Sequence, residues 1–170
     1  MNDSMRQDAI SRVGITIAID GPAGSGKSTV SKGLAAMLRI GYLDTGAMYR
    51  ALTWYCLDRG IDLADKAAVA AAANEMPLRL VSDPSDPHVW VGEREITEEI
   101  REPRIALEIK HVSTNLDVRA WMATEQRRRM MEAREEGSGM IAEGRDITTV
   151  VCPDADVRIL LLADQEARLR

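Results

Sequence analysis

The sequence contains few cysteines and histidines, and this scarcity narrows the chemistry that the protein can perform. Cys56 lies in a helix-like segment and Cys152 lies beside Pro153, so the only two cysteines lack the spacing of a metal site. We therefore expect two reduced thiols in a cytoplasmic protein. The only two histidines, His88 and His111, lie outside the motifs that carry chemistry, and neither is expected to act in catalysis.

The sequence also lacks an excess of positive charge and a long apolar run. Its 22 Lys and Arg residues against 27 Asp and Glu residues give a net charge of −5, which argues against a nucleic-acid-binding protein. No run approaches the ~18 apolar residues of a membrane span, so no membrane partner is expected. The N-terminal segment MNDSMRQDAISR is polar and lacks the apolar stretch of a secretion signal, and residues 1–14 are expected to form a disordered arm.

A glycine-rich loop between a strand-like and a helix-like segment is the most informative feature of the sequence. Residues 15–20 are mostly apolar and β-branched, which predicts a buried parallel strand. The segment GPAGSGKS then matches the complete phosphate-binding loop pattern, from Gly21 to Ser28. Glycines let backbone N–H groups point at a phosphate chain, and the N-terminus of the following helix adds its dipole. In this pattern Lys27 reaches the outer phosphates and the Ser28 hydroxyl coordinates Mg²⁺, which predicts nucleotide binding.

Loops of this kind serve GTPase switches, motors and small-molecule kinases, and two missing motifs argue against the first. A guanine-reading motif has the sequence Asn-Lys-x-Asp, but none of the three asparagines, Asn2, Asn74 and Asn115, is followed by lysine. No Asp-x-x-Gly sequence occurs either. The sequence therefore disfavours a GTPase.

Strand-like and helix-like segments alternate through most of the chain. Short strands are expected at residues 15–20, 42–43, 140–144 and 157–164, and Gly41 is expected to end the first helix. This alternation predicts right-handed crossovers and a parallel sheet covered on both faces. Ligands of such sheets bind at the carboxyl ends of the strands.

The segment between residues 62 and 136 has a different pattern. An alanine-rich helix is followed by alternating apolar residues at 77–96, which predict a small antiparallel insert, and then by mostly helical sequence. We therefore predict an α/β fold of the P-loop NTPase type, a three-layer sandwich with a parallel central sheet and a small antiparallel and helical insert. The predicted parts are an arm at 1–14, a core at 15–61, the insert region at 62–136 and a core continuation at 137–170.

Three arginines are predicted to bind a second phosphate group. Arg50 follows the second strand, Arg145 follows the third strand, and Arg119 lies at the start of a helix. Convergent guanidinium groups near the loop would clamp an anionic acceptor. An acceptor phosphate oxygen is already charged, so its phosphorylation needs positioning and charge neutralisation rather than a strong base.

Five segments carry a resemblance to a known family. They are IAIDGPAGSGKST, YLDTGAMYRA, EREITEEIR, DVRAWMATEQRR and IAEGRDITTVVCPDADVRILLLA, and they extend across nearly the whole sequence from Ile15 onward. With these segments the chain resembles the bacterial cytidylate kinases, which are nucleoside monophosphate kinases. The resemblance implies phosphoryl transfer from ATP to CMP or dCMP with Mg²⁺, by a cytoplasmic monomer whose insert binds the monophosphate.

The resemblance also implies roles for individual residues. Those implied to hold the ATP phosphates are Gly21, Pro22, Ala23, Gly24, Ser25, Gly26, Lys27, Ser28 and Thr29, with Ser28 as the metal ligand. Those implied to bind the acceptor nucleotide are Thr45, Arg50, Arg119, Arg145 and Asp146. An Asp acceptor beside an Arg donor suits the hydrogen-bonding edge of cytosine. Catalytic roles are implied for Lys27, Arg145 and Asp44, and Glu143 is a candidate for the surroundings of the magnesium ion.

Two alternatives remain open at this point. Members of the family continue after the last strand into an arginine-rich lid, whereas this sequence ends at Arg170, with Arg168 in the position of the first lid arginine. A lid excludes water and completes the charge clamp, so one alternative is a nucleotide-binding fragment with impaired catalysis. The other is a different small-molecule kinase built on the same loop.

Overall fold

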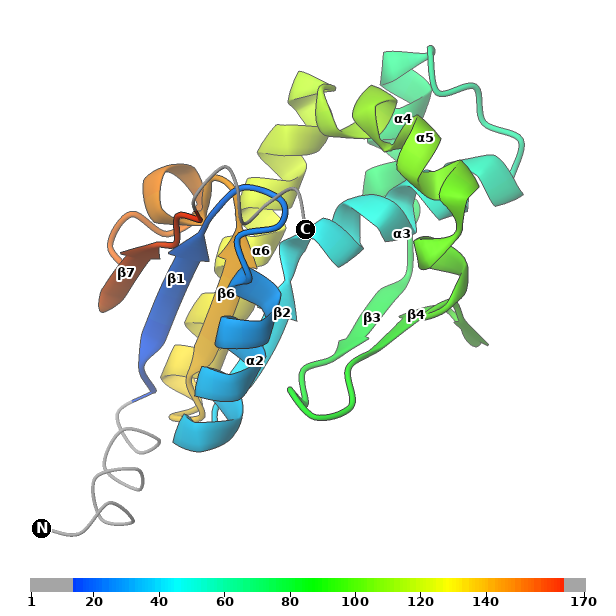
Figure 1. Ribbon diagram of the computed structural model, residues 1–170. Coiled ribbons are helices and arrows are strands. Elements are labelled where there is room, and N and C mark those ends of the chain that lie inside the picture. The colour runs from blue at the N-terminus through cyan, green and yellow to red at the C-terminus, as the bar shows by residue number, and fades with distance from the viewer. Residues whose placement is uncertain (1–13, 164–170) are drawn as a thin grey trace, which may run out of the picture. The chain divides into compact units, whose positions relative to one another are not determined.

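The computed structural model describes residues 14–163, and these residues form two compact units (Figure 1). Among the described residues, the first unit comprises 14–45, 82–86 and 126–163, and the second comprises 46–81 and 87–125. The expected disordered arm, apart from Gly14, lies outside the described residues, as does Arg168.

The first unit contains a four-stranded sheet in which all neighbouring strands are parallel. The strands are β1 (Thr16–Asp20), β2 (Gly41–Asp44), β6 (Met140–Gly144) and β7 (Val157–Leu160), in the spatial order β2-β6-β1-β7 (Figure 1). The five residues of β1 and the five of β6 are all buried, as central strands of a parallel sheet should be.

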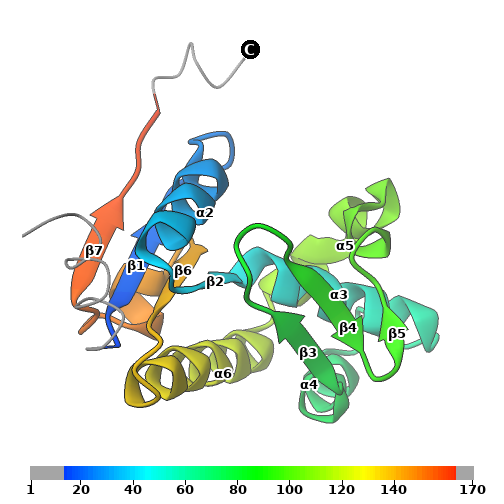
Figure 2. The ribbon, with the colours of Figure 1, turned by 90° about the horizontal axis from the view of Figure 1, so that it is seen from below.

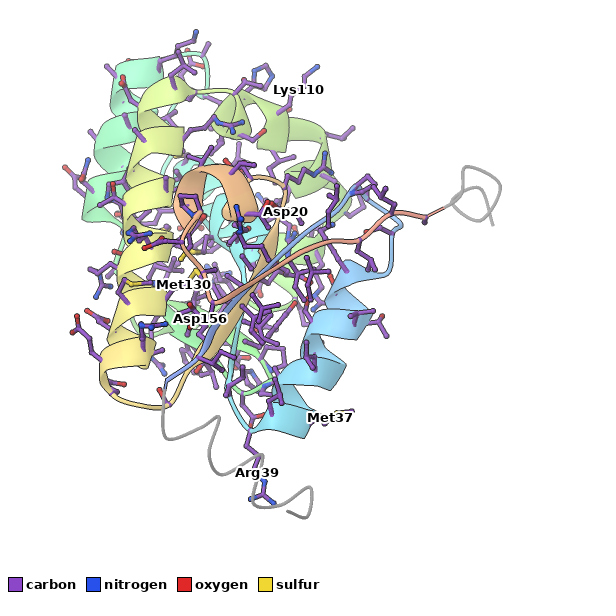
Figure 3. All side chains as sticks on the ribbon, turned by 90° about the vertical axis from the view of Figure 1, so that its left-hand side faces the viewer. Asp20, Met37, Arg39, Lys110, Met130 and Asp156 are labelled. Atoms are coloured by element: carbon purple, nitrogen blue, oxygen red, sulfur yellow. The ribbon has the colours of Figure 1, made fainter. Side chains whose placement is uncertain are left out.

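Helices cover the sheet of the first unit on both faces. The helix α2 (Lys27–Leu38) packs on one face, and the part of α6 (Leu116–Glu135) that belongs to this unit lies on the other (Figures 2 and 3). The core on the α2 side is apolar and comprises Ile17, Ile19, Ala35, Ile40, Tyr42 and Ile141. On the other side Met130, labelled in Figure 3, is completely buried. The predicted three-layer α/β sandwich with a parallel central sheet is confirmed.

The first helix ends earlier than the position of Gly41 led us to expect. The chain leaves α2 at Arg39, which adopts a left-handed backbone conformation with φ 56°. Its amide and that of Ile40 donate to carbonyl groups of the last helical turn. This early turn lets Ile40, only 4% exposed, enter the core, and Gly41 becomes the first residue of β2.

The second unit combines helices with a small antiparallel sheet. The strands β3 (Leu78–Val81), β4 (His88–Val91) and β5 (Arg94–Glu95) form this sheet in sequence order, which confirms the predicted insert. The helical elements are α3 (Thr45–Asp58), α4 (Lys66–Glu75), η1 (Glu99–Arg101), α5 (Pro103–Ser113) and the first part of α6. The helix α4 is capped by Asp65, whose carboxylate accepts the amide of Ala68 at 3.0 Å.

Two further sequence expectations concern thiols and membrane segments. Cys56 and Cys152 are both buried and neither forms a disulfide. Within residues 14–163, no helix is both long enough and apolar enough to cross a membrane.

Candidate active site

The predicted phosphate-binding loop connects β1 to α2 at the carboxyl edge of the parallel sheet. Gly24 and Gly26 have φ values of 75° and 81°, a left-handed conformation that glycine adopts without steric cost. Gly26 is the N-cap residue of α2, and glycine has no side chain to accept hydrogen bonds from the first helical amides. Those amides and the helix dipole are therefore directed at the space that the loop surrounds.

Two side chains of the loop show how it is prepared for an anion. Lys27 folds back over the loop, with its Nζ atom 3.4 Å from the carbonyl oxygen of Pro22. The Ser25 hydroxyl is buried and has no hydrogen-bond partner among the described residues. A buried hydroxyl without a hydrogen-bond partner costs free energy, so a ligand that accepts a hydrogen bond from it would relieve this cost.

A carboxylate from the neighbouring strand meets the end of the loop. Glu143 lies on β6 and is only 3% exposed, and its Oε1 atom accepts the Ser28 hydroxyl at 2.7 Å. Its Oε2 atom is also buried and has no hydrogen-bond partner among the described residues. Burial raises the pKa of Glu143, and the charge of Asp44 adds to the rise, against the lowering effects of Ser28 and Lys27.

Asp44 and Tyr42 complete this polar group from the strand β2. The register pairs Asp44 directly with Glu143 across the two parallel strands. Burial raises the pKa of the Tyr42 phenol, and the charges of Asp44 and Glu143 raise it further. The Ser28 hydroxyl at the end of the loop therefore bonds to Glu143, and the Asp44 carboxylate and the neutral Tyr42 phenol come from the neighbouring strand.

This donor set fits a magnesium ion. Mg²⁺ prefers oxygen ligands and usually keeps several waters, and it binds proteins through one or two carboxylates together with substrate phosphates. The Ser28 hydroxyl, the unpartnered Oε2 atom of Glu143 and the carboxylate of Asp44 are oxygen donors of this kind.

Thr45 and Gly144 lie in close contact where β2 and β6 end. The Thr45 hydroxyl is buried and donates to the carbonyl of Glu143 at 2.7 Å. A Cβ atom on Gly144 would lie 2.5 Å from the Thr45 hydroxyl oxygen and 2.9 Å from Ile147. Any larger residue at position 144 would force Thr45 or Ile147 to move. The predicted acceptor residue Thr45 thus lies in close contact with the strand that leads to Arg145.

Asp20, which the sequence analysis did not single out, anchors the segment that carries Arg145 and Asp146. Its buried carboxylate accepts the amides of Ile147 and Thr148 at 2.8 Å each, and the Thr148 hydroxyl at 2.6 Å. These residues begin η2 (Ile147–Val151), a short π-helical turn that lies beside Asp20 in Figure 3. The signal in the sequence is an acidic residue that ends an otherwise apolar strand.

The predicted site residues are thus divided between the two units. The loop, Asp44, Thr45, Arg145 and Asp146 belong to the first unit, and Asp44, Thr45 and Arg145 stand at or directly after the carboxyl ends of β2 and β6. Arg145 is exposed and Asp146 is half-buried. Arg50, half-buried on α3, and Arg119, exposed near the start of α6, belong to the second unit. Contact of these two arginines with an acceptor remains a prediction.

The parallel sheet with a phosphate-binding loop at its carboxyl edge, together with the antiparallel insert, defines the P-loop nucleoside monophosphate kinase fold. The sequence profile of the family described as cytidylate kinase matches residues 17–170. The chain therefore belongs to the cytidylate kinase family.

Curated relatives agree with this assignment. A cytidylate kinase of Streptomyces avermitilis is 43% identical over 154 residues, which cover 91% of this chain and 65% of the relative. A cytidylate kinase of Rhodococcus jostii is 44% identical over 154 residues, covering 91% of this chain and 66% of the relative. A bifunctional pantoate ligase/cytidylate kinase of Thermosynechococcus vestitus is 43% identical over 154 residues, or 29% of its length. The chain thus spans just under two thirds of the length of the first two relatives.

Proposed function

We propose that the protein transfers the terminal phosphoryl group of ATP to CMP or dCMP, giving ADP and CDP or dCDP. The observation that carries this proposal is the meeting of the Ser28 hydroxyl with the buried carboxylate of Glu143, at the sheet edge from which Arg145 and Asp146 extend. A donor nucleotide held by the loop would thus lie at the same edge as an acceptor held by Arg145. Similarity to proteins named cytidylate kinase supports CMP as the acceptor.

The loop would bind the donor. The backbone amides between Gly21 and Thr29 and the N-terminus of α2 would hold the phosphates of ATP. Lys27 would leave the Pro22 carbonyl, to which its hydrogen bond is long at 3.4 Å, and would bind the outer phosphates. Its charge would offset the negative charge that builds up on the transferred group.

Magnesium would be held at the Ser28 end of the loop. The ion would supply positive charge that offsets part of the charge of the phosphates. The Ser28 hydroxyl would be its direct ligand, and Glu143 would accept hydrogen bonds from the waters around the ion through its unpartnered Oε2 atom. Asp44, paired with Glu143 across the strands, would orient the same waters.

The acceptor would be bound by side chains rather than by a backbone loop. Arg50, Arg119 and Arg145 would pair with the phosphate of the monophosphate, because guanidinium groups bind phosphates with two parallel hydrogen bonds. Asp146 would accept the exocyclic amine of cytosine, and Thr45 would contact the same nucleotide. The acceptor oxygen is already ionised, so charge neutralisation and alignment replace a general base. We propose that the protein does this as a monomer, on nucleotides of the cytoplasm.

The test is ADP release from ATP with CMP, dCMP, UMP, AMP and shikimate as separate acceptors. We expect turnover with CMP or dCMP to exceed that with AMP and shikimate by at least tenfold. Turnover with shikimate or AMP instead would favour another P-loop small-molecule kinase. ATP binding by calorimetry without turnover on any acceptor would favour a nucleotide-binding fragment with impaired catalysis.

Arg50 separates the two substrate sites in the same assay. We expect Arg50→Ala to raise the KM for CMP by about ten- to a hundredfold, the cost of one or two hydrogen bonds to a charged group, and the KM for ATP by less than twofold. Arg59 directly follows α3 and stacks on the ring of Tyr55. Arg59→Ala is the matched control and should change neither KM value. Equal effects of Arg50→Ala on both substrates would remove Arg50 from the acceptor site.

A further inference from the structure

Asp20 joins two segments that are far apart in the sequence and close in the fold. It is the last residue of β1 and directly precedes the loop residue Gly21. Its carboxylate reaches 127 and 128 residues along the chain to the amides of Ile147 and Thr148. We propose that Asp20 is the positioning residue for the segment Arg145–Asp146, and that it sets the affinity for the acceptor nucleotide. The inference rests on the proposed function.

The geometry gives Asp20 a complete set of partners on η2. The first amides of a helical turn have no partner within the turn, and a carboxylate that accepts them fixes its start. Both oxygen atoms are used, because Oδ1 accepts the amide of Ile147 and Oδ2 accepts the amide and the hydroxyl of Thr148. Asp20 is only 3% exposed, so these bonds do not compete with bulk water.

The bonds of Asp20 act on the residues that precede Ile147. The carbonyl of Asp146 accepts the amides of Val150 and Val151, so Asp146 itself is the first residue of the hydrogen-bonded turn. Arg145 stands between Gly144, where β6 ends, and this turn. Fixing the turn therefore leaves Arg145 and Asp146 little backbone freedom, although the side chain of Arg145 is exposed.

Within residues 14–163, the hydrogen bonds of the Asp20 carboxylate go to Ile147 and Thr148, and none goes to the phosphate-binding loop. The backbone of Asp20 pairs with Gly144 on one side and Leu160 on the other, and these bonds do not involve the carboxylate. A change of the carboxylate alone should therefore disturb the acceptor segment more than the donor loop. This asymmetry distinguishes positioning from a general contribution to stability.

Asp156 offers a matched control within the same sheet. It is also an aspartate that accepts an amide and a hydroxyl, both from Thr16, at 2.9 and 3.1 Å. It acts at the amino end of β1, whereas Asp20 acts at the carboxyl end. Asp156→Asn should lower stability without changing the preference for either nucleotide.

The experiment compares Asp20→Asn and Asp156→Asn with the unmodified protein in steady-state kinetics and in amide hydrogen exchange. The asparagine in Asp20→Asn presents an NH₂ group to one of the two amides and loses that bond. We expect the KM for CMP to rise about tenfold or more and the KM for ATP to stay within twofold. The amides of Ile147 and Thr148 should exchange at least tenfold faster, while those of β6 remain protected.

Thr148 tests the same contact from the other side. Thr148→Val removes the hydroxyl that donates to Asp20 and keeps both amides, so we expect a smaller rise in the KM for CMP, about threefold. Thr148→Ser keeps the hydroxyl and should restore the unmodified value. Failure of the serine to rescue would show that the methyl group, and not the bond to Asp20, matters.

The outcomes separate this inference from the proposed function. Normal turnover of CMP by the unmodified protein, with an unchanged KM for CMP in Asp20→Asn, overturns the positioning role alone. Equal rises in the KM values for ATP and CMP, or equal behaviour of Asp156→Asn, also overturn it. No turnover of CMP by the unmodified protein counts against the proposed function, and the assignment of Asp20 to an acceptor site falls with it.

Discussion

Carboxylate side chains lie at both ends of the parallel sheet, but their hydrogen bonding differs between the two ends. At the amino end, Asp156 accepts two hydrogen bonds from Thr16 and forms an ion pair with Arg134. At the carboxyl end, the buried Oε2 atom of Glu143 and the buried hydroxyl of Ser25 have no hydrogen-bond partner among the described residues. Buried polar groups are normally satisfied, so the incomplete end is where a ligand would gain most by binding.

The pKa values of the two carboxylates show the same difference. The Thr16 amide and the Arg134 guanidinium lower the pKa of Asp156, so its charged form is stabilised by the fold. Burial raises the pKa of Glu143, so the fold disfavours its charged form. The charged form of Asp156 thus stabilises the protein, whereas the charged form of Glu143 is disfavoured until a cation offsets it.

The largest expected effect follows from removal of the loop lysine. Lys27→Ala should lower kcat by about 10²–10³-fold, because a positive charge that offsets the charge of the transferred group is lost. The thermal unfolding temperature should change little, because the hydrogen bond from the Nζ atom to the carbonyl oxygen of Pro22 is long, at 3.4 Å, and therefore weak. Lys66→Ala, at an exposed position on α4, is the control and should keep kcat within twofold. A fall of less than about fivefold in Lys27→Ala would argue against phosphate binding by this loop.

Two glycines at opposite ends of β6 compare the sheet ends directly. A Cβ atom on Gly144 would lie 2.5 Å from the Thr45 hydroxyl oxygen, and one on Gly139 would lie 2.8 Å from the carbonyl oxygen of Ile15. Both Gly144→Ala and Gly139→Ala should lower the free energy of unfolding by about 1–3 kcal/mol, measured by urea denaturation. The cause is overpacking at both positions and, at Gly139, also the left-handed backbone, with φ 75°. Only Gly144→Ala should raise the KM for CMP, because only Gly144 touches Thr45. A matching KM change in Gly139→Ala would show that the sheet ends are not independent.

The next prediction concerns stability as a function of pH. Asp156 has a lowered pKa, so its contribution is present above the ordinary pKa of about 3.9 and is lost as the pH falls through the value in the fold. Asp156→Asn should therefore be less stable than the unmodified protein at pH 7, and the difference should disappear in acid. Glu143 has a raised pKa, so its penalty is absent below the ordinary value of about 4.3 and appears as the pH rises through the value in the fold.

Glu143→Gln should accordingly unfold at the same or a higher temperature than the unmodified protein at pH 7, while it loses phosphoryl transfer. Thermal melts between pH 3 and pH 8 measure both variants. The comparison between the sheet ends would be wrong if both variants lost stability with the same dependence on pH.

The sequence was sufficient for the parts of this comparison that depend on local patterns. The strand β1 follows from an apolar, β-branched run and the antiparallel insert from apolar alternation, and the structure confirms both. The contacts of Asp20 could not be predicted, because they depend on the register that pairs Asp20 with Gly144 across β1 and β6. The same register pairs Asp44 with Glu143, and no spacing in the sequence encodes it. The turn at Arg39 was missed because a left-handed arginine is uncommon and a glycine stood two residues away.

The smallest expected effects concern two neighbouring arginines of α6, Arg127 and Arg128. Arg128 pairs with Glu132 one turn along the exposed helix, and such pairs contribute less than about 0.5 kcal/mol. Arg127 instead makes two bonds to Asp154, at 2.6 and 2.9 Å, and a weaker one to the carbonyl of Val151. Arg127→Ala should therefore lower the unfolding temperature more than Arg128→Ala, because a bidentate pair also fixes the segment before β7. Neither variant should change the KM for ATP or CMP, and a change in Arg128→Ala would place this helix face at a nucleotide site.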